Sequence, residues 1–159
     1  MKPVAPSVLA FMTLLLPGIG RAAETCPWLN AATAGGFLGR TVTATVLHEN
    51  ANHDDATCAF TSPIYELRIA VETMDPPHSE YMKQAEQCGA ETIPLKAIGN
   101  EAVVCSPNTH VARVVGRVRN RIFTILINTS DSTAASTTAS DLLREKAHAV
   151  AEQVAGILF

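Results

Sequence analysis

The 159-residue sequence is poor in charged and in aromatic side chains. Charged residues make up 17% of the chain and aromatic residues 5%, whereas 47% of the residues are hydrophobic. This composition excludes a disordered chain, because disordered segments combine low hydrophobicity with high net charge. The net charge of -3 also excludes the basic surface of a general nucleic-acid-binding protein. We therefore expect one domain with a buried core and no nucleic-acid partner.

The hydrophobic run near the N-terminus is too short to span a membrane as a helix. It covers residues 8–16, whereas a spanning helix needs about 20 residues. Lys2 precedes this run, and the Pro-Gly pair at residues 17–18 interrupts it. Gly20 and Ala22 then fit the small-residue positions of a signal peptidase site, and cleavage one residue later is the alternative. A short basic region, an apolar run and a small-residue site in this order are typical of a secretory signal peptide.

We predict that residues 1–22 are a signal peptide and that residues 23–159 form a single exported α+β domain. A lipid anchor is not expected, because acidic Glu24 stands among the residues before Cys26, where a lipidation signal has small residues. The mature protein should therefore be secreted or periplasmic, without a stable membrane anchor.

All four cysteines lie in the part that is expected to be exported: Cys26, Cys58, Cys88 and Cys105. An even number of cysteines in an exported protein indicates disulfide bonds. Their wide spacing contains no C-x-x-C motif, so neither a zinc site nor a thioredoxin-like site is indicated. Three pairings are possible, and we favour Cys26 with Cys58 and Cys88 with Cys105. Each of these bonds would join the end of a predicted helix to a predicted strand.

Hydrophobic periodicity predicts a helix, three strands, a helix, three strands and a final helix. The strands are predicted over residues 41–48, 56–61, 65–72, 101–105, 110–118 and 121–129. The helices are predicted from Pro27 to the glycines at 35–36, over residues 79–88, and from a cap at Ser140 onward. The strand over 121–129 is apolar on both sides and should lie in the middle of the sheet. We expect an α+β fold in which helices cover an antiparallel sheet of about six strands, in the order α-β-β-β-α-β-β-β-α.

Three short motifs accompany this order of elements. They are Cys-Pro-Trp-Leu at residues 26–29, Cys-Ala-Phe at 58–60 and Ile-Gly-Asn-Glu-Ala at 98–102. With them the sequence resembles small exported bacterial proteins of unknown function that are similar in fold to the PsbP-type extrinsic subunit of photosystem II. The resemblance covers nearly all of the mature chain and implies a PsbP-like fold. It implies neither a reaction nor catalytic residues.

Three arginines in and after the fifth predicted strand are the candidate ligand-binding residues. Arg113, Arg117 and Arg119 have the same parity, so a regular strand would present them on one face of the sheet. Guanidinium groups bind carboxylates and phosphates through paired hydrogen bonds. The expected partner is therefore a small anionic ligand or an envelope protein. The alternative is an exposed sheet face on which these arginines pair with Glu66 and Glu72.

A second group of polar residues lies between the first two predicted strands. His48, His53, Asp54 and Asp55 fall within eight residues, and imidazole with carboxylate can bind a divalent metal. Nothing in the spacing enforces the geometry that a metal requires. We therefore expect a solvated loop here, and neither a metal site nor a cofactor.

Signals for catalysis are weak in this sequence. Serine and threonine gather at residues 130–140 without a nucleophile-elbow motif, and the cysteines are expected to be oxidised. We predict a non-catalytic exported binding or accessory domain. The alternative is a small hydrolase or metal-dependent enzyme that assembles its site from His48, His53, His110 and scattered acids.

Overall fold

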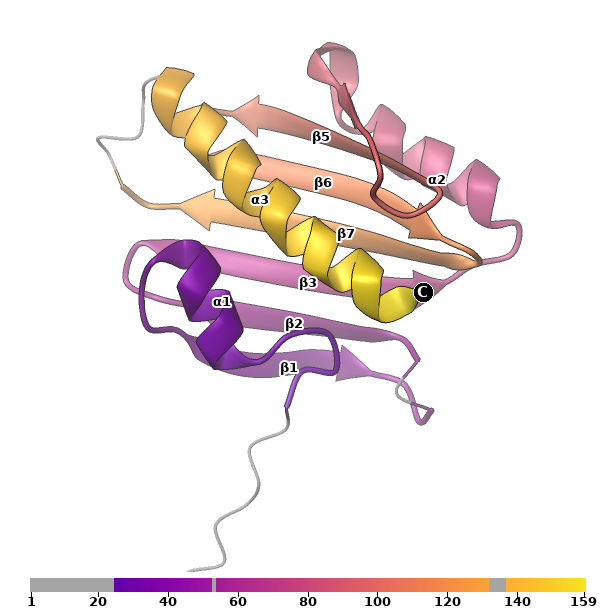
Figure 1. Ribbon diagram of the computed structural model, residues 1–159, viewed down its shortest axis with the longest axis horizontal. Helices are drawn as coiled ribbons and strands as arrows, with labels where there is room; N and C mark the ends of the chain where they lie inside the picture. The colour runs from indigo at the N-terminus through magenta and orange to yellow at the C-terminus, as the bar shows by residue number, and fades with distance from the viewer. Residues whose placement is uncertain (1–24, 53, 132–136) are drawn as a thin grey trace, which may run out of the picture.

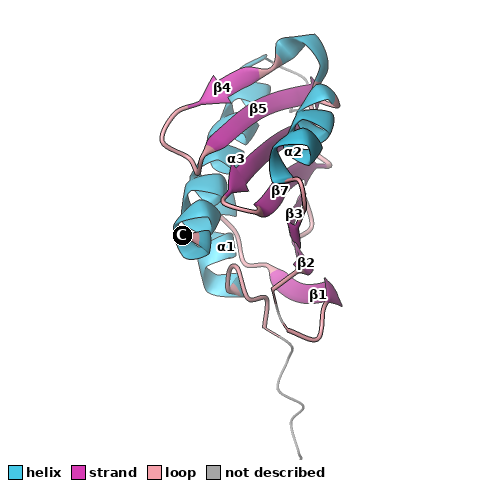
Figure 2. Cartoon of the chain, turned by 90° about the vertical axis from the view of Figure 1, so that its right-hand side faces the viewer, coloured by secondary structure: helices cyan, strands magenta, loops and turns pink. Residues whose placement is uncertain are grey.

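The computed structural model describes residues 25–52, 54–131 and 137–159, and shows an α+β fold. Its seven strands form one antiparallel sheet in the order β1-β2-β3-β7-β6-β5-β4. Two helices lie on one face of this sheet and one on the other (Figures 1 and 2). The predicted signal peptide over residues 1–22 lies outside the described residues. In the part of the chain that is described, no helix is long and apolar enough to cross a membrane.

The elements follow the predicted order, with one additional strand. The helices are α1 (Ala31–Leu38), α2 (Pro77–Glu86) and α3 (Thr137–Leu158), and a 3₁₀ helix covers Gly89–Glu91. The strands are β1 (Thr43–Glu49), β2 (Ala56–Thr61), β3 (Tyr65–Thr73), β4 (Ile93–Leu95), β5 (Glu101–Asn108), β6 (Val111–Val118) and β7 (Arg121–Thr129). Strand β7, which is apolar on both sides, lies in the centre of the sheet as predicted.

Strand β4 corrects the prediction of about six strands. No strand was predicted between the helix over residues 79–88 and the strand that begins at residue 101, and Pro94 in this segment cannot donate a backbone hydrogen bond to a strand ladder. Residues Ile93–Leu95 instead pair with β5 at the edge of the sheet. Proline is tolerated at an edge, because one side of the strand has no neighbour there.

Helix α1 also differs from its prediction. It begins after Asn30, whose side chain accepts a hydrogen bond from the backbone N–H of Thr33. It continues through the glycines at residues 35–36, which were expected to end it, and stops at Gly39. Gly39 has φ 70°, a left-handed conformation that glycine adopts without steric cost.

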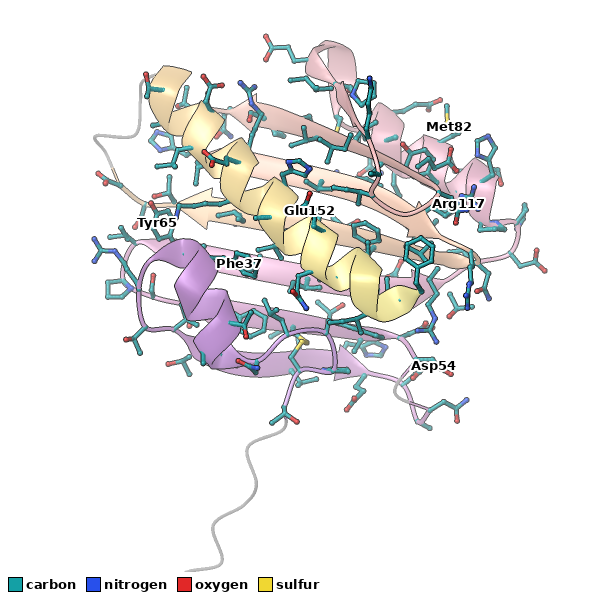
Figure 3. All side chains as sticks on the ribbon, viewed as in Figure 1. Phe37, Asp54, Tyr65, Met82, Arg117 and Glu152 are labelled. Carbon is teal, nitrogen blue, oxygen red and sulfur yellow. A yellow bond between two sulfur atoms is a disulfide. The ribbon has the colours of Figure 1, made fainter. Side chains whose placement is uncertain are left out.

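The face of the sheet that carries α1 and α3 holds the main core. Alternation along β3 and β7 buries Leu67, Ile69, Val71, Phe123, Ile125 and Ile127 on this side. Helix α3 adds Leu143, Ala147, Val150 and Val154 at spacings of three and four residues. Lys146 ties α3 to α1, because its Nζ donates a 2.7 Å hydrogen bond to the carbonyl of Phe37. The same ammonium group lies 5.8 Å from the ring centre of Tyr65, a residue that is labelled in Figure 3.

The opposite face, which we call the α2 face, is only half covered. Helix α2 packs on β6 and β7 over a small second core that includes Tyr81, Val103, Val115 and Ile122. Within the described residues, no helix covers the same face of β1, β2 and β3 (Figure 2). The exposed side chains there include Thr43, Thr45, Thr61, Arg68 and Glu72. One half of the α2 face is therefore an open, polar sheet surface.

Two disulfide bonds hold outlying segments to the sheet. Cys26 is joined to Cys58 of β2, and Cys88, just after α2, is joined to Cys105 of β5. These are the two sequential pairs that the sequence analysis favoured. The second bond fixes the C-terminal end of α2 to the sheet.

Candidate functional site

The three predicted ligand-binding arginines do not share one face. Arg113 and Arg117 lie on the α2 face of β6, because Ala112, Val114 and Val118 point into the main core. Arg119 lies beyond the end of β6, in the turn to β7, with φ 56°. The parity argument is therefore correct for Arg113 and Arg117 and wrong for Arg119, because the strand ends at Val118.

Arg117 is paired with a carboxylate near the start of α2. Its Nε donates to Oε1 of Glu101 on β5, and its Nη1 donates to the carbonyl of Arg119 at 2.9 Å. Nδ1 of His78 lies 2.9 Å from the same carboxylate oxygen. The acids expected to balance the arginines do not fill this role: Glu66 pairs with Arg68 on its own strand. The charge of Arg117, which is labelled in Figure 3, is thus compensated by the carboxylate of Glu101.

The environment of Glu101 favours its ionised form. Burial on its own raises the pKa of this carboxyl, but the hydrogen bonds from His78 and Arg117 and their charges outweigh it, and the pKa is lowered. Burial also raises the pKa of Tyr81, with a further increase from the charge of Glu101. Glu101 therefore stays charged and holds Arg117 in place.

Arg113 has a different environment at the other end of α2. Its Nη1 donates a 2.9 Å hydrogen bond to the amide oxygen of Gln87, which follows the last residue of α2. Its Nε is buried and has no hydrogen-bond partner among the described residues. Burial lowers the pKa of Arg113, and no carboxylate opposes this effect. The partly buried positive charge of Arg113 therefore has one neutral amide as its hydrogen-bond partner among the described residues, and its Nε stays unsatisfied.

The other described arginines do not share this combination of burial and missing counter-charge. Four of them pair with carboxylates: Arg68, Arg117, Arg121 and Arg144. Arg40 and Arg119 are exposed, so water can solvate their charges. Arg113 is the partly buried arginine without a carboxylate in the described structure.

The sheet register places a second arginine near Arg113, one that the sequence analysis did not select. Arg113 is opposite Leu126 of β7, and Leu126 is opposite Arg68 of β3. We call Arg68, Leu126 and Arg113 the arginine row. The two arginines lie on the same face with one strand between them, so their Cα atoms are about 10 Å apart. In the sequence, the position of Arg68 between apolar residues indicated only that it lies on the polar side of its strand. The strand order β3-β7-β6 brings it near Arg113.

The predicted polar loop holds no described metal site. Asp54 pairs with Arg121 at 2.7 Å, and Asp55 accepts hydrogen bonds from the backbone and hydroxyl of Thr73. His53 lies outside the described residues. Among the residues that are described, no group of three or more histidine, cysteine, aspartate or glutamate side chains is placed to hold a metal ion. The two aspartates instead fasten the loop to the strands beside it.

The histidines of the alternative enzyme hypothesis are not brought together. His48 lies near the end of β1, and His110 lies in the turn between β5 and β6 at the opposite end of the sheet (Figure 1). His78, which the sequence analysis did not select, is closer to a catalytic arrangement than these histidines, because it is paired with a carboxylate. Its ring is 66% exposed and held by Glu101. No spacing signal could reveal this pair, because 23 positions separate the two residues.

A carboxylate-held histidine is one part of a catalytic triad, but the pair lacks an adjacent nucleophile in the described structure. The hydroxyl of Ser79 donates to the carbonyl of Pro76, not to His78. All four cysteines are in disulfide bonds. The pair therefore anchors α2 to β5 and β6.

Comparison with known proteins adds no assignment to this geometry. Neither the protein-family models nor the curated proteins include a match to this chain. The function must therefore be argued from the charges and surfaces described above.

Proposed function

We propose that the protein is an exported, non-catalytic binding domain that receives an anionic group of its ligand or partner at Arg113. The observation that carries this proposal is the partly buried guanidinium without a carboxylate. Removing a charge from water costs free energy unless another charge or several hydrogen bonds replace the water. A carboxylate or phosphate would supply both.

Export is part of the same proposal. Two disulfide bonds are typical of proteins that mature outside the reducing cytoplasm. We propose that residues 1–22 are removed as a signal peptide and that the mature domain acts as a secreted or periplasmic protein. The motifs at residues 26–29 and 98–102 support kinship with exported proteins of PsbP-like fold, which we include in this proposal.

A binding role is preferred to the alternative of a small hydrolase or metal-dependent enzyme. The His78–Glu101 pair is the described feature closest to catalytic machinery, and the hydroxyl of the adjacent residue Ser79 donates to the carbonyl of Pro76 instead of to this pair. Arg113 needs no further chemical group to act, because its own N–H donors are sufficient to bind an anion.

The test is a nuclear magnetic resonance titration of the purified protein with acetate and with inorganic phosphate at low salt. We expect a saturable shift of the Arg113 Nε–H signal and of the Leu126 amide. Arg113→Gln should weaken this binding by about 10-fold to 100-fold, the range for a lost hydrogen bond to a charged group.

The control is Arg40→Gln, which removes an exposed arginine elsewhere and should leave the titration unchanged. The proposal is wrong if neither anion produces a saturable shift at Arg113, or if Arg113→Gln binds the anions as the wild type does.

A further inference from the structure

The surface around Arg113 consists of helix α2, which forms a wall on one side, and the exposed sheet beside it, which forms a floor. Helix α2 forms the wall: Gln84 accepts a 3.1 Å hydrogen bond from Thr124 of β7, and Gln87 accepts one from Arg113 of β6. The floor begins at the part of β7 beside α2 and continues across β3, β2 and β1, and no described helix covers these last three strands on this side (Figure 2). Sites for small molecules are concave and bury most of the ligand surface. An open sheet surface beside one helix is therefore better suited to bind a peptide or a protein surface than a small molecule.

We infer that the partner is a protein that lays an extended acidic segment across β7 and β3 beside α2, with Arg68 as the second anchor after Arg113. This inference rests on the proposed function at Arg113 and names the occupant of that site. It commits to an acidic protein segment, and free small anions are an outcome of the test below.

Charge complementarity in the arginine row is the first argument for an acidic segment. The side chain of Arg68 is 51% exposed, and its Nε donates a 2.8 Å hydrogen bond to Oε1 of Glu66. The two terminal nitrogens of Arg68 have no described partner, so they can donate hydrogen bonds to a second carboxylate. Arg113 has no carboxylate at all. The row therefore carries more positive charge than the surrounding described groups compensate.

Spacing is the second argument. Alternate side chains of an extended peptide point the same way and lie about 7 Å apart. Two acidic side chains at positions i and i+2 can thus reach two flexible arginines whose Cα atoms are about 10 Å apart. Leu126 lies between the arginines and is only partly buried, so the aliphatic part of the segment can pack on it.

The surface continues beyond the row toward β2. Glu66 and Asn128 line a hollow of about 310 Å³ at the ends of β3 and β7, together with Thr61 and Ser62. Glu66 and Asn128 pair with each other two residues along the strands from the pair Arg68 and Leu126, and so lie on the same face. A segment held at the arginine row can therefore place a neighbouring side chain in this hollow.

The test uses an array of random decapeptides, printed in sets that differ in their number of Asp and Glu residues. We expect binding to the purified protein to rise with the number of acidic residues. The best acidic peptide should bind at least about tenfold more tightly than acetate, because it contacts both arginines. Its counterpart with Gln in place of Glu and Asn in place of Asp should not bind measurably.

Variants separate the two arginines. Arg68→Ala should weaken the acidic peptide by about fivefold to tenfold and leave the acetate titration at Arg113 unchanged. Arg113→Ala should weaken both probes by about tenfold or more. Arg40→Ala removes an exposed arginine away from the row and should change neither.

The outcomes distinguish the inference from the proposed function. Acidic and neutral peptides of equal affinity, or an Arg68→Ala variant with wild-type affinity, would overturn the acidic segment while the acetate shift at Arg113 still supports the proposed function. Phosphate bound as tightly as the best peptide would show a small-anion site instead. Absence of any saturable binding at Arg113 would overturn both.

Discussion

Glu101 connects three elements through one carboxylate. It lies on β5, pairs with Arg117 of β6 and accepts from His78 of α2, while its own side chain is 25% exposed. Because its pKa is lowered in the folded protein, folding favours the ionised form. The resulting stabilisation is present above the pKa that glutamate has in the unfolded chain. It is lost as the pH falls through the folded-state pKa.

Glu101→Gln should therefore destabilise the protein at neutral pH and not in acid. We expect the free energy of unfolding to fall by about 1 kcal/mol at pH 7, since a charged hydrogen-bond acceptor becomes neutral. The difference from wild type should shrink once the pH falls below the ordinary glutamate value of 4.5. Urea denaturation at a series of pH values measures it. A constant difference across that series would contradict this account, and Glu72→Gln, on an exposed part of the same face, serves as control.

Arg113 is proposed as the anion-binding residue and Arg117 is not, and the sequence alone could not have separated these two arginines. Their equal parity on a strand is visible in the sequence. Their different environments depend on Glu101 and Gln87, which lie 16 and 26 positions away. Periodicity predicts which way a side chain points, but not which distant group lies there.

At the scale of elements, α2 depends on attachments at both ends more than on apolar burial. Of its residues only Tyr81 is buried. His78 binds Glu101 near the start of the helix, and the Cys88–Cys105 bond follows its end. Loss of that bond should therefore release α2 locally.

Replacing Cys88 and Cys105 with alanine should free the C-terminal half of α2. We expect a loss of about 3 kcal/mol in the free energy of unfolding, the scale for a disulfide loop of this length. Amide hydrogen exchange in α2 should accelerate, and acetate binding at Arg113 should weaken because Gln87 is no longer held beside it.

Replacing Cys26 and Cys58 with alanine is the matched control. It removes the other disulfide and lowers stability, but should leave exchange in α2 and binding at Arg113 as in the folded wild type. If both pairs of substitutions affect α2 equally, the local role of the Cys88–Cys105 bond is wrong.

The sequence predicted most elements, because long strands with a buried side alternate clearly. Ile69 and Ile125 are examples, and both are buried in strands that were expected. It missed β4, whose three residues include Pro94, and it ended α1 too early at the glycines of 35–36. Predictions fail for such short elements because they carry too few residues for a clear periodic pattern. Local propensity then decides the prediction, whereas tertiary pairing decides the structure that forms.

At the scale of the whole molecule, the two faces of the sheet differ in what they contribute. The α1/α3 face buries the large aliphatic side chains of β3 and β7, so it supplies most of the stability. The α2 face is closed over β6 and β7 and open over the β1–β2–β3 half. The arginine row lies at the boundary between the closed and open halves. Substitutions on the open half should therefore alter recognition with little effect on folding.

Thr45 tests this division, because it is exposed on β1 in line with Ala59 and Arg68. Thr45→Glu and Thr45→Lys should each change stability by no more than about 0.5 kcal/mol, as is usual for surface positions. Thr45→Glu should weaken the best acidic peptide and Thr45→Lys should strengthen it, each by about twofold to threefold at low salt and less at 0.15 M. Fluorescence anisotropy and thermal melts measure the two effects.

The matched controls are Ala32→Glu and Ala32→Lys, which place the same charges on α1, at an exposed position on the opposite side of the sheet. They should change peptide affinity much less than the Thr45 variants do, most clearly at 0.15 M salt, because the screening length is then about 8 Å and α1 lies on the other side of the sheet. Equal shifts from the Thr45 and Ala32 variants would show that the peptide responds to the total charge of the protein. A response confined to Thr45, opposite in sign for the two substitutions, would place the acidic segment on the open half of the α2 face.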